Sequence, residues 1–583
     1  MIRPIHTLLY VTLAAVLLSG CQKEKTPWVP ADPAEEEEEV SQPGEYFLPL
    51  IETTDLHGYI VNGTGEAAHY RLAYIADKVN DIRGRGAEYA KDRLLLLDGG
   101  DIYQGASISN LLAGEPVYMA MDRMGYDAVA VGNHEFDWDF ETLVDPDATM
   151  PDYRWEGQDC VNAVPVLCAN LYRDGERESR TRDYVIVEKT AVNSAGESLP
   201  VRIGVIGFAI NYASSIMTSK FTGKGYSIRE DYSIADELAA TLESSGQCDA
   251  TILLIHGAAD NAAGKLGEDS AIDLVLGGHS HQTMTGTSGT GIAYLQGGRY
   301  GEHFASTSLK FSTDGTDVAF DGIVRSKISP VDSNRDRHAK AGQNAEDLEE
   351  DILAVSDYAL EATAEQTREV LGYITVSADT YTIAGSAGRA CTMANWMCDI
   401  IRRIGDADVA FVNGGGVRTI ITLDGQARKD ITVANVYEMF PFANTTYVYS
   451  ITYPELLKVL EYSLTDSGAS LFTGMTGINC YFKGYSVTML SKDGEIIYQN
   501  GVWADDWGKR KLKLAVSEYL ATNQRVDSYT KLKNPLLEWN ETAKLLSNDL
   551  IDNENAVRVL REEAAASGGH LFIDTATHFL YVQ

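Results

Sequence analysis

The chain has 583 residues, of which 44% are hydrophobic, so a single small domain is excluded and we expect two hydrophobic cores. Its formal net charge of −36 argues against a long nucleic acid as partner, because a polyanionic backbone needs a basic surface. A small anionic ligand remains compatible with this charge, since metal ions or a few arginines reverse the potential locally.

Residues 1–21 are predicted to form an export signal. Arg3 precedes an apolar segment from Leu8 to Leu18, and Ser19-Gly20-Cys21 follows. Charged, apolar and then small residues are the order of a secretory signal. Because the order ends on cysteine, it resembles a bacterial lipoprotein signal. That resemblance implies a protein exported and lipid-anchored to the bacterial cell envelope through Cys21, while a plain secretory signal with an incidental cysteine is the alternative.

Residues 22–44 are predicted to be a flexible acidic tether. They are charged, contain several prolines and alanines, and include five consecutive glutamates, Glu35 to Glu39. Such a composition cannot bury a core. No later stretch is long and apolar enough to span a membrane, so we expect the lipid to be the only membrane attachment.

Polar clusters directly follow five apolar runs in the first half of the chain. They are Asp55-Leu56-His57 after 46–51, Gly100-Asp101 after 94–97, Gly132-Asn133-His134-Glu135 after 128–131, His256 after 252–255 and Gly278-His279-Ser280-His281 after 274–276. Short apolar runs bounded by glycine are typical of buried strands, and ligands collect at the carboxyl ends of such strands. We therefore expect all five clusters at one edge of a sheet.

The side chains of these clusters form a mixed set of nitrogen and oxygen ligands. The set is Asp55, His57, Asp101, Asn133, His256, His279 and His281. It favours zinc, manganese or iron over magnesium or calcium, which prefer oxygen ligands. Seven ligands exceed what one tetrahedral ion takes, so we expect two divalent ions sharing a carboxylate, an arrangement that activates water for attack on a phosphoryl group. Taken singly, Asp55-Leu56-His57 is more often an ordinary turn and His256 a structural histidine, but such separate explanations do not account for the ordered series of five.

The series D-x-H, GD, GNHE, H and GHSH resembles the calcineurin-like metallophosphoesterases. Residues 45–583 as a whole resemble the bacterial 5'-nucleotidase and 2',3'-cyclic phosphodiesterase family, because the string from Asn413 to Arg418 and Pro441-Phe442 match motifs of its substrate domain. This resemblance implies an α/β fold. An N-terminal four-layer α/β/β/α metallophosphoesterase sandwich would be followed by a second α/β domain that binds the substrate.

The resemblance also implies roles for individual residues. One ion would be bound by Asp55, His57, Asp101 and His281, and the other by Asp101, Asn133, His256 and His279, with Asp101 as the bridge. His134 and Asp137 match the catalytic pair of the family. A cationic imidazole beside the ions would stabilise the transition state of phosphoryl transfer, and a carboxylate on its other nitrogen would raise its basicity. The alternative for Asp137 is the start of a helix over 137–143.

The first domain is predicted over 45–330, since the strand patterns end near Pro330. Residues 331–370 are charged and alanine-rich with helical periodicity, so they are predicted to be a helical connection. A substrate-binding α/β domain over 371–583 follows. Its expected elements are a helix over 391–403, a strand over 409–412, a glycine loop over 414–416 and a helix over 453–463.

Substrate contacts are expected in this second domain. A glycine triplet before Arg418 would let backbone amides approach an anion that the guanidinium clamps, although such triplets are more often tight turns. The resemblance assigns Asn413, Gly415 and Arg418 to the substrate, and Phe442 and Tyr519 to a nucleobase; without it, both rings would be core residues. The segment 523–528 departs from the Gly-Gly-Asp-Gly turn of the family, and Asp527 is the candidate for the ribose contact.

The cysteines show no Cys-x-x-Cys spacing, so a thiolate metal site is not expected. Cys160 and Cys168 are close enough in sequence to form a disulfide, or they stay free.

The sequence therefore predicts a phosphohydrolase that releases phosphate from 5'-nucleotides, with 2',3'-cyclic nucleotides and nucleotide sugars as further candidates. One alternative keeps the fold and acts on a non-nucleotide phosphoester, which the altered 523–528 segment would admit. The other is a non-catalytic surface binding lipoprotein, against which His134 and the complete ligand set count.

Overall fold

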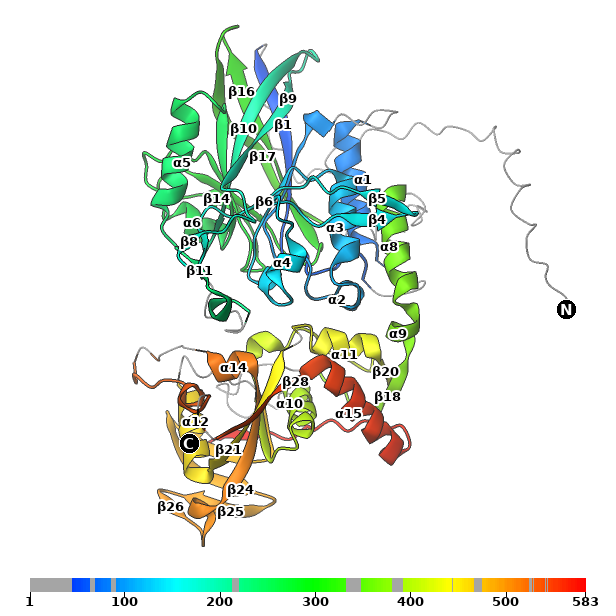
Figure 1. The fold of residues 1–583 in the computed structure, drawn as a ribbon, viewed down its shortest axis with the longest axis vertical. Coiled ribbons are helices and arrows are strands. Elements are labelled where there is room, and N and C mark those ends of the chain that lie inside the picture. The colour runs from blue at the N-terminus through cyan, green and yellow to red at the C-terminus, as the bar shows by residue number, and fades with distance from the viewer. Residues whose placement is uncertain are drawn as a thin grey trace, which may run out of the picture. The chain divides into compact units, whose positions relative to one another are not determined.

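The computed structural model describes residues 44–62, 69–84, 91–211, 220–331, 348–379, 392–442, 444–465, 474–523, 527, 529–540, 542 and 544–582. The predicted signal with Cys21, nearly all of the predicted tether, and Cys391 lie outside these residues. The fold is mixed α/β, as the sequence predicts (Figure 1). In the part of the chain that is described, every helix is too short or too polar to cross a membrane.

Of the strands between Glu45 and Pro330, 12 form two layers that meet where β1 and β9 pair at Phe47 and Val192. The first layer contains β17 (Val318–Pro330), β16 (His303–Thr313), β1 (Glu45–Thr53), β2 (Leu95–Asp98), β3 (Ala128–Ala130) and β6 (Val166–Leu167), in that order. The second contains β14 (Thr283–Thr287), β15 (Ala293–Gly297), β13 (Leu274–Leu276), β12 (Ala250–His256), β10 (Ser198–Ala209) and β9 (Tyr184–Val192). Within these layers β1-β2-β3-β6 and β10-β12-β13-β15 are parallel.

Side chains on successive strand residues point to opposite faces, and this alternation builds three cores. Leu97 and Leu254 pack between the two layers. Leu96 faces the other way, against α1 (Arg71–Arg83), α3 (Glu115–Met124) and α8 (Glu350–Ala362). Leu253 faces α5 (Ser233–Ser244) and α6 (Ala259–Ala263). The resulting order of helices, sheet, sheet and helices is the predicted four-layer sandwich, with α1 and α5 on opposite sides (Figure 1).

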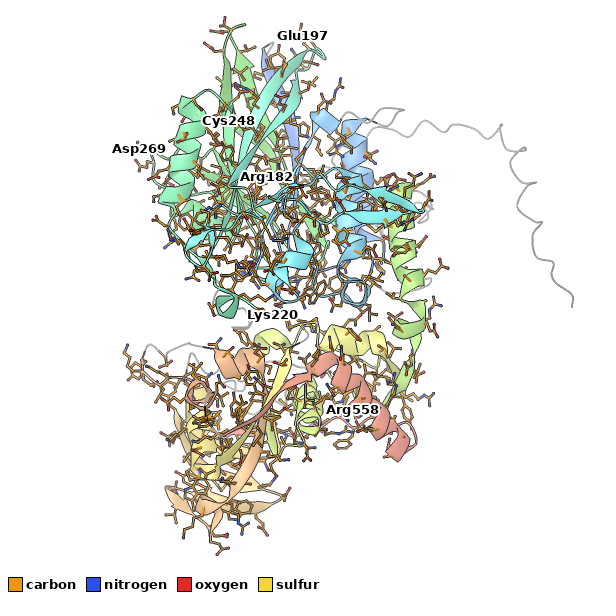
Figure 2. The ribbon with its side chains drawn as sticks, viewed as in Figure 1. Arg182, Glu197, Lys220, Cys248, Asp269 and Arg558 are labelled. Carbon is orange, nitrogen blue, oxygen red and sulfur yellow. The ribbon has the colours of Figure 1, made fainter. Side chains whose placement is uncertain are left out.

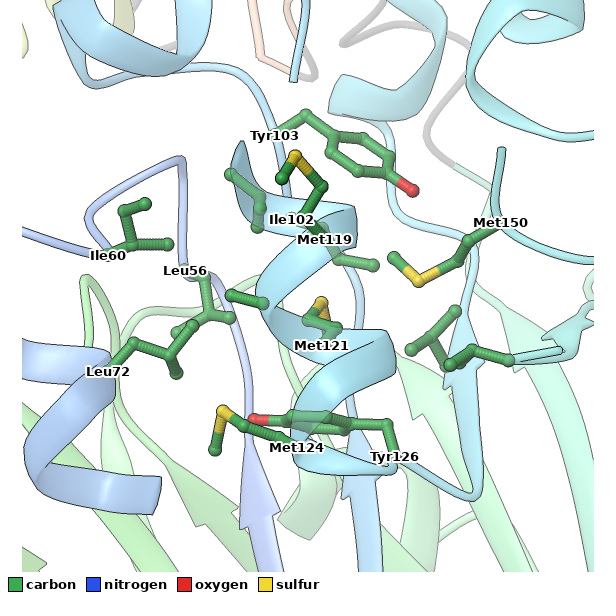
Figure 3. Close-up of a cluster of buried hydrophobic side chains, with 14 of the residues drawn as sticks. Leu56, Ile60, Leu72, Ile102, Tyr103, Met119, Met121, Met124, Tyr126 and Met150 are labelled. Atoms are coloured by element: carbon green, nitrogen blue, oxygen red, sulfur yellow. The ribbon is translucent and has the colours of Figure 1, made fainter. Parts of the chain in front are cut away.

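Methionines of α3 fill much of the core on the α1 side. Met119, Met121 and Met124 lie in the same core as Leu72 of α1 and Tyr126, which follows α3 (Figure 3). On the other side, Cys248 packs with α5 just before β12, and the turn holding Glu197 joins β9 to β10 (Figure 2). Both helical layers thus bury the outward faces of the strands and hold the strand ends in a fixed register.

Short elements complete this part of the chain. They are α2 (Ser107–Leu111), α4 (Phe140–Leu143), β4 (Tyr153–Trp155), β5 (Gln158–Cys160), β7 (Leu171–Arg173), β8 (Glu176–Arg177) and β11 (Tyr226–Ile228). Cys160 and Cys168 are free thiols, so the disulfide considered from the sequence is absent. Cys168 is buried, and burial raises the pKa of its thiol to about 11.

The described part of the predicted helical connection contains α8 and α9 (Ala364–Arg368). Ile352 and Val355 of α8 are buried in the same core as α1 and α3, so this helix packs as an integral part of the first sandwich.

Beyond the connection, two five-stranded sheets form a second α/β unit. One has the order β22 (Gly474–Thr476), β19 (Val409–Val412), β27 (Lys511–Ser517), β21 (Thr445–Thr452) and β28 (Leu545–Ile551). The other has the order β26 (Val502–Trp503), β25 (Glu495–Gln499), β24 (Ser486–Lys492), β23 (Asn479–Lys483) and β29 (Phe579–Tyr581). A two-stranded sheet pairs β18 (Val370–Ile374) with β20 (Lys429–Thr432).

Helices α10 (Thr392–Ile404), α11 (Val433–Met439), α12 (Tyr453–Ser463), α14 (Glu518–Thr522) and α15 (Asp552–Ser567) accompany these sheets. Strand β19 and helix α12 have the predicted bounds. Helix α12 starts where it does because Thr452 and Glu455 form a capping box, in which the Glu455 carboxylate accepts the Thr452 N–H at 2.8 Å.

Candidate active site

The five polar clusters meet at the carboxyl ends of the parallel strands, as predicted. Asp55 follows β1, Asp101 follows β2, Asn133 follows β3, His256 ends β12 and His279 follows β13. Parallel pairing places these ends together from both layers of the sandwich. The side chains of the clusters are buried, apart from the partly buried His279, Ser280 and His281.

Most of the candidate ligands sit on backbone in the left-handed region. These are Asp55 (φ 51°), His57 (φ 48°), Asp101 (φ 57°), His279 (φ 67°) and His281 (φ 59°). Each such residue costs on the order of 1 kcal/mol and persists only when its surroundings fix it. Hydrogen bonds from Asp55 N to Gly100 O and from His57 N to Asp101 O, both 2.9 Å, fasten two of the loops to each other. A strained backbone at five neighbouring ligand positions is typical of a functional centre.

Asp55, His57, Asp101 and His281 form a first group whose ligand atoms all lie within 4.8 Å of one another. The His57 Nε2 and His281 Nε2 atoms are 3.2 Å apart. Asp55 Oδ1 lies 3.4 Å from His281 Nε2, and Asp101 Oδ2 lies 3.8 Å from His57 Nε2. Nitrogen lone pairs and carboxylate oxygens that converge on one point form a fitting set for a divalent cation.

Asp101, His256 and His279 form a second group with the same spacing. The Asp101 Oδ2 atom lies 3.2 Å from His256 Nε2. Asn133 adds its amide oxygen, at 3.3 Å from His256 Nε2 and 2.8 Å from His279 Nδ1. Since Asp101 belongs to both groups, the two candidate cation positions are adjacent and have its carboxylate in common.

Backbone carbonyls orient two of the imidazoles. The Nδ1 of His57 lies 2.7 Å from Gln104 O, and the Nδ1 of His256 lies 2.7 Å from Gly99 O. A proton on Nδ1 that is donated to a carbonyl leaves the Nε2 lone pair for a metal. Gly100 allows this packing, because a Cβ there would come within 2.9 Å of His256 Nδ1.

Burial lowers the pKa of His279 to about 4 and that of His281 to about 3. Both imidazoles are therefore neutral at pH 7, as ligation requires. Burial also disfavours the cationic form of His256, but the Asp101 carboxylate outweighs it and raises the pKa of His256 to about 10. A proton on His256 thus balances the negative charge of the Asp101 carboxylate, and a divalent ion would displace that proton.

Glu135 fastens three segments of this centre. Its Oε2 accepts hydrogen bonds from Gly132 N at 2.6 Å and Asp101 N at 3.0 Å, and its Oε1 accepts one from Ile102 N at 2.8 Å. Burial raises the pKa of Glu135 to about 7. Glu135 ends the Gly-Asn-His-Glu string, but the sequence pattern indicates no role for it. Only the fold shows that its carboxylate binds a loop more than 30 residues earlier.

His134 and Asp137 form a buried pair, with His134 Nδ1 2.5 Å from Asp137 Oδ2. Burial alone would lower the pKa of His134, but the charge and hydrogen bond of Asp137 outweigh it, so the pKa is raised. The backbone N–H of His134 donates to Asp101 Oδ1 at 2.9 Å, which links the pair to the aspartate common to both ligand groups. Asp137 ends the short 3-10 turn His134–Phe136, whereas α4 begins at Phe140, so the alternative of a helix start at Asp137 is wrong.

A cavity of about 380 Å³ opens over this centre. Of the predicted site residues, it is lined by Asp101, Asn133, His134, Asp137, His279, His281, Asn413, Gly415, Arg418, Phe442 and Tyr519. The Phe442 ring stacks on His134 with centroids 5.2 Å apart, and Arg418 Nη2 lies 3.3 Å from His134 Nε2. Residues from both α/β units therefore surround one space.

Asp527 is not among the residues that line this cavity. Its Oδ1 accepts hydrogen bonds from Tyr529 N at 3.1 Å, Thr530 N at 2.6 Å and Thr530 Oγ1 at 2.8 Å. The carboxylate thus stabilises its own turn. Residues 524–526 and 528 lie outside the described residues.

Ser280, Arg299 and Asn444 also line the cavity, and the sequence analysis assigned no role to any of them. For Arg299 a signal existed in the string Gly297-Gly298-Arg299-Tyr300-Gly301, which directly follows an apolar run like the five clusters.

Comparison with known proteins agrees with this geometry. Residues 48–283 match the calcineurin-like phosphoesterase family, and residues 370–497 match the 5'-nucleotidase C-terminal domain family. The chain is 24% identical over 527 residues to the trifunctional nucleotide phosphoesterase protein YfkN of Bacillus subtilis, an alignment covering 83% of this chain and 32% of YfkN. It therefore spans about a third of the length of that relative.

Protein UshA of Yersinia enterocolitica is 25% identical over 468 residues, covering 73% of this chain and 78% of UshA. The crystal structure of a 5'-nucleotidase precursor from Thermus thermophilus superposes with a TM-score of 0.65 at 19% identity, covering 92% of this chain and 99% of that one, which shows a shared fold. The chain belongs to the calcineurin-like metallophosphoesterases that carry a 5'-nucleotidase C-terminal domain, and it is a metal-dependent phosphoester hydrolase.

Proposed function

We propose that the protein hydrolyses 5'-nucleotides at a centre of two divalent ions. The observation that carries the proposal is the cavity of about 380 Å³, because candidate metal ligands line it together with Arg418, Phe442 and Tyr519 from the second unit. This volume falls in the range of small-molecule sites. The metal ligands and Arg418 suit the phosphate of a nucleotide, and the aromatic side chains suit its base.

The donor set supports two ions. The first would be held by Asp55, His57, Asp101 and His281, and the second by Asp101, Asn133, His256 and His279. Mixed imidazole and carboxylate ligands favour zinc, manganese or iron. Bound ions would supply an activated water and neutralise charge on the phosphoryl oxygens.

His134 is proposed to serve the leaving group. Asp137 holds Nδ1, so the Nε2 edge is the one that faces Arg418 and the cavity. The raised pKa favours the protonated imidazole, and this form can donate a proton to the departing ribose oxygen. The Arg418 guanidinium, 3.3 Å from Nε2, adds positive charge where negative charge develops.

The base end of the substrate is assigned to the second unit. Phe442 and Tyr519 both line the cavity and are proposed to stack on a nucleobase, a contact worth about 1–3 kcal/mol for each ring. Asn413 and Gly415 line the same wall and are proposed to contact the sugar or phosphate. Asp527 was the candidate for the ribose, but its Oδ1 is engaged in its own turn.

That observation on Asp527 favours a second candidate function, hydrolysis of a non-nucleotide phosphoester. Without the ribose contact, the cavity selects less strongly for a nucleoside. The third possibility, a non-catalytic binding protein, is disfavoured because the His134–Asp137 pair and both ligand groups are complete.

Export and lipid anchoring through Cys21 are part of the proposal and rest on the sequence alone. They are tested by expressing the Cys21→Ser variant in bacteria with labelled fatty acid. We expect the label in the unaltered protein and none in the variant, and equal labelling of both would refute the anchor.

Catalysis is tested on metal-depleted protein reloaded with manganese or zinc. Phosphate release would be measured from AMP, 2',3'-cyclic AMP, a nucleotide sugar, a sugar phosphate and a small aryl phosphate. We expect AMP to give the highest kcat/KM. If no substrate releases phosphate, the catalytic proposal fails. If the sugar or aryl phosphate matches AMP and the Tyr519→Ala variant cleaves AMP normally, the non-nucleotide alternative holds.

A further inference from the structure

The outer nitrogen of His281 has an unusual neighbour. Its Nε2 points into the first ligand group, 3.4 Å from Asp55 Oδ1, while its Nδ1 lies 3.5 Å from Arg299 Nη1. His57 and His256 instead direct Nδ1 at backbone carbonyls. Among the described residues, Arg299 is the only group at hydrogen-bond distance from His281 Nδ1.

This pairing leaves two donors facing each other. When Nε2 of a neutral imidazole binds a metal, Nδ1 carries the proton and donates it to an acceptor. A guanidinium has N–H donors and no acceptor. The His281 Nδ1–H and the Arg299 Nη1–H therefore need an oxygen from elsewhere. Both side chains line the cavity, so that oxygen can come from a ligand bound there.

Arg299 is held rigidly at this place by the next residue, Tyr300. The Tyr300 N–H donates to Asp55 O at 2.7 Å, and its carbonyl accepts from Arg71 Nη1 at 2.7 Å. Its ring meets the rings of His57 and His281 edge-on, with centroids 5.4 and 5.6 Å away. Tyr300 also has left-handed backbone, with φ 56°. The turn that carries Arg299 is thus fastened to the loop of the first ligand group.

The guanidinium itself remains available to a ligand. It lies over the Tyr300 ring, 4.8 Å from the centroid, and its nearest carboxylate, on Glu302, is 4.0 Å away, beyond hydrogen-bond distance. The side chain is 46% exposed, so the guanidinium is accessible to a ligand that enters the cavity.

We propose that Arg299 is a substrate-binding residue. Its guanidinium binds a non-bridging oxygen of the phosphate that is to be released. This inference rests on the proposed function and deepens it. It gives the site a cation on the His281 side in addition to Arg418 on the His134 side. A phosphate monoester, with its second negative charge, should gain more from this cation than a diester does.

The test compares Arg299→Met, which keeps packing on Tyr300 without the charge, with Arg299→Lys and with Arg510→Ala. Arg510 is a matched control, since it is 45% exposed and lies 4.2 Å from the Trp507 centroid, outside the cavity. The affinity of manganese-loaded protein for inorganic phosphate would be measured by calorimetry, without turnover. KM for AMP and for 2',3'-cyclic AMP, metal content and Tm would be measured in parallel.

We expect Arg299→Met to weaken phosphate binding and to raise KM for AMP about tenfold each, with metal content and Tm unchanged. KM for the cyclic diester should rise less, and Arg299→Lys should recover part of the loss. Arg510→Ala should match the unaltered protein. Unchanged phosphate affinity in Arg299→Met would overturn the proposal, and a loss of metal together with Tm would show a structural role instead. If the unaltered protein fails to hydrolyse AMP, the proposed function fails, while the phosphate affinities still test Arg299.

Discussion

Replacing Glu135 by glutamine should weaken the metal centre without removing a ligand. In Glu135→Gln one carboxylate oxygen becomes an NH2 group. At the Oε2 position, the NH2 group would face two other donors, the N–H groups of Gly132 and Asp101. We therefore expect it at the Oε1 position, where it faces only the N–H of Ile102. One charge-assisted hydrogen bond is then lost and one buried donor is left unsatisfied, at a cost of about 2–4 kcal/mol.

This cost falls on the loops that carry Asp101 and Asn133, and removal of such outer support typically lowers metal affinity about 10–100-fold. Metal affinity would be measured by competition with a chelator, beside denaturant unfolding. Glu178→Gln is the matched control, because Glu178 is buried and accepts the Arg180 N–H at 3.0 Å outside the site. If Glu135→Gln binds metal as tightly as Glu178→Gln, the carboxylate does not hold the ligands in place and the reasoning is refuted.

The remaining predictions concern catalysis, substrate binding and pH. His134→Ala should lower kcat about 10²–10⁴-fold and keep its metal, whereas Asp101→Ala should lose bound metal by elemental analysis; full activity of the former would refute the assigned role. Tyr519→Ala should raise KM for AMP by the factor that corresponds to a loss of about 1–3 kcal/mol of stacking, and it should leave KM for an aryl phosphate unchanged. It is a cleaner test than Phe442→Ala because Phe442 also packs on His134. Burial raises the pKa of Asp552 from 3.8 to about 8, so the folded state retains a proton that the unfolded state loses, and stability should fall as pH rises from about 4 to 8. Asp552→Asn should remove this slope from Tm measured between pH 5 and 9, and parallel curves for both proteins would contradict it.

Elements whose signals lie within a few residues could be predicted from the sequence. The strand at 409–412 and the helix at 453–463 have their predicted bounds, because an apolar run ended by glycine and a Thr-x-x-Glu capping box are each complete within a few residues. The convergence of the five clusters could also be predicted, since ligands that follow parallel strands share one edge whatever the strand order. The predicted α/β fold class is confirmed, because both matched families agree with the family that the sequence motifs resemble.

Tertiary structure decided whatever depends on a partner far along the chain. Glu135 binds backbone 33 and 34 residues earlier, and Arg418 meets His134 across 284 residues, so no local pattern marks either contact. Asp527 is the sequence-based candidate for the ribose contact, yet its carboxylate accepts hydrogen bonds within its own turn. Arg299 follows one more strand of the same kind, but only packing shows that it faces His281. The reason is that the burial and the hydrogen-bond partners of a side chain depend on its neighbours in three dimensions. Those neighbours come from segments that are far apart in the sequence.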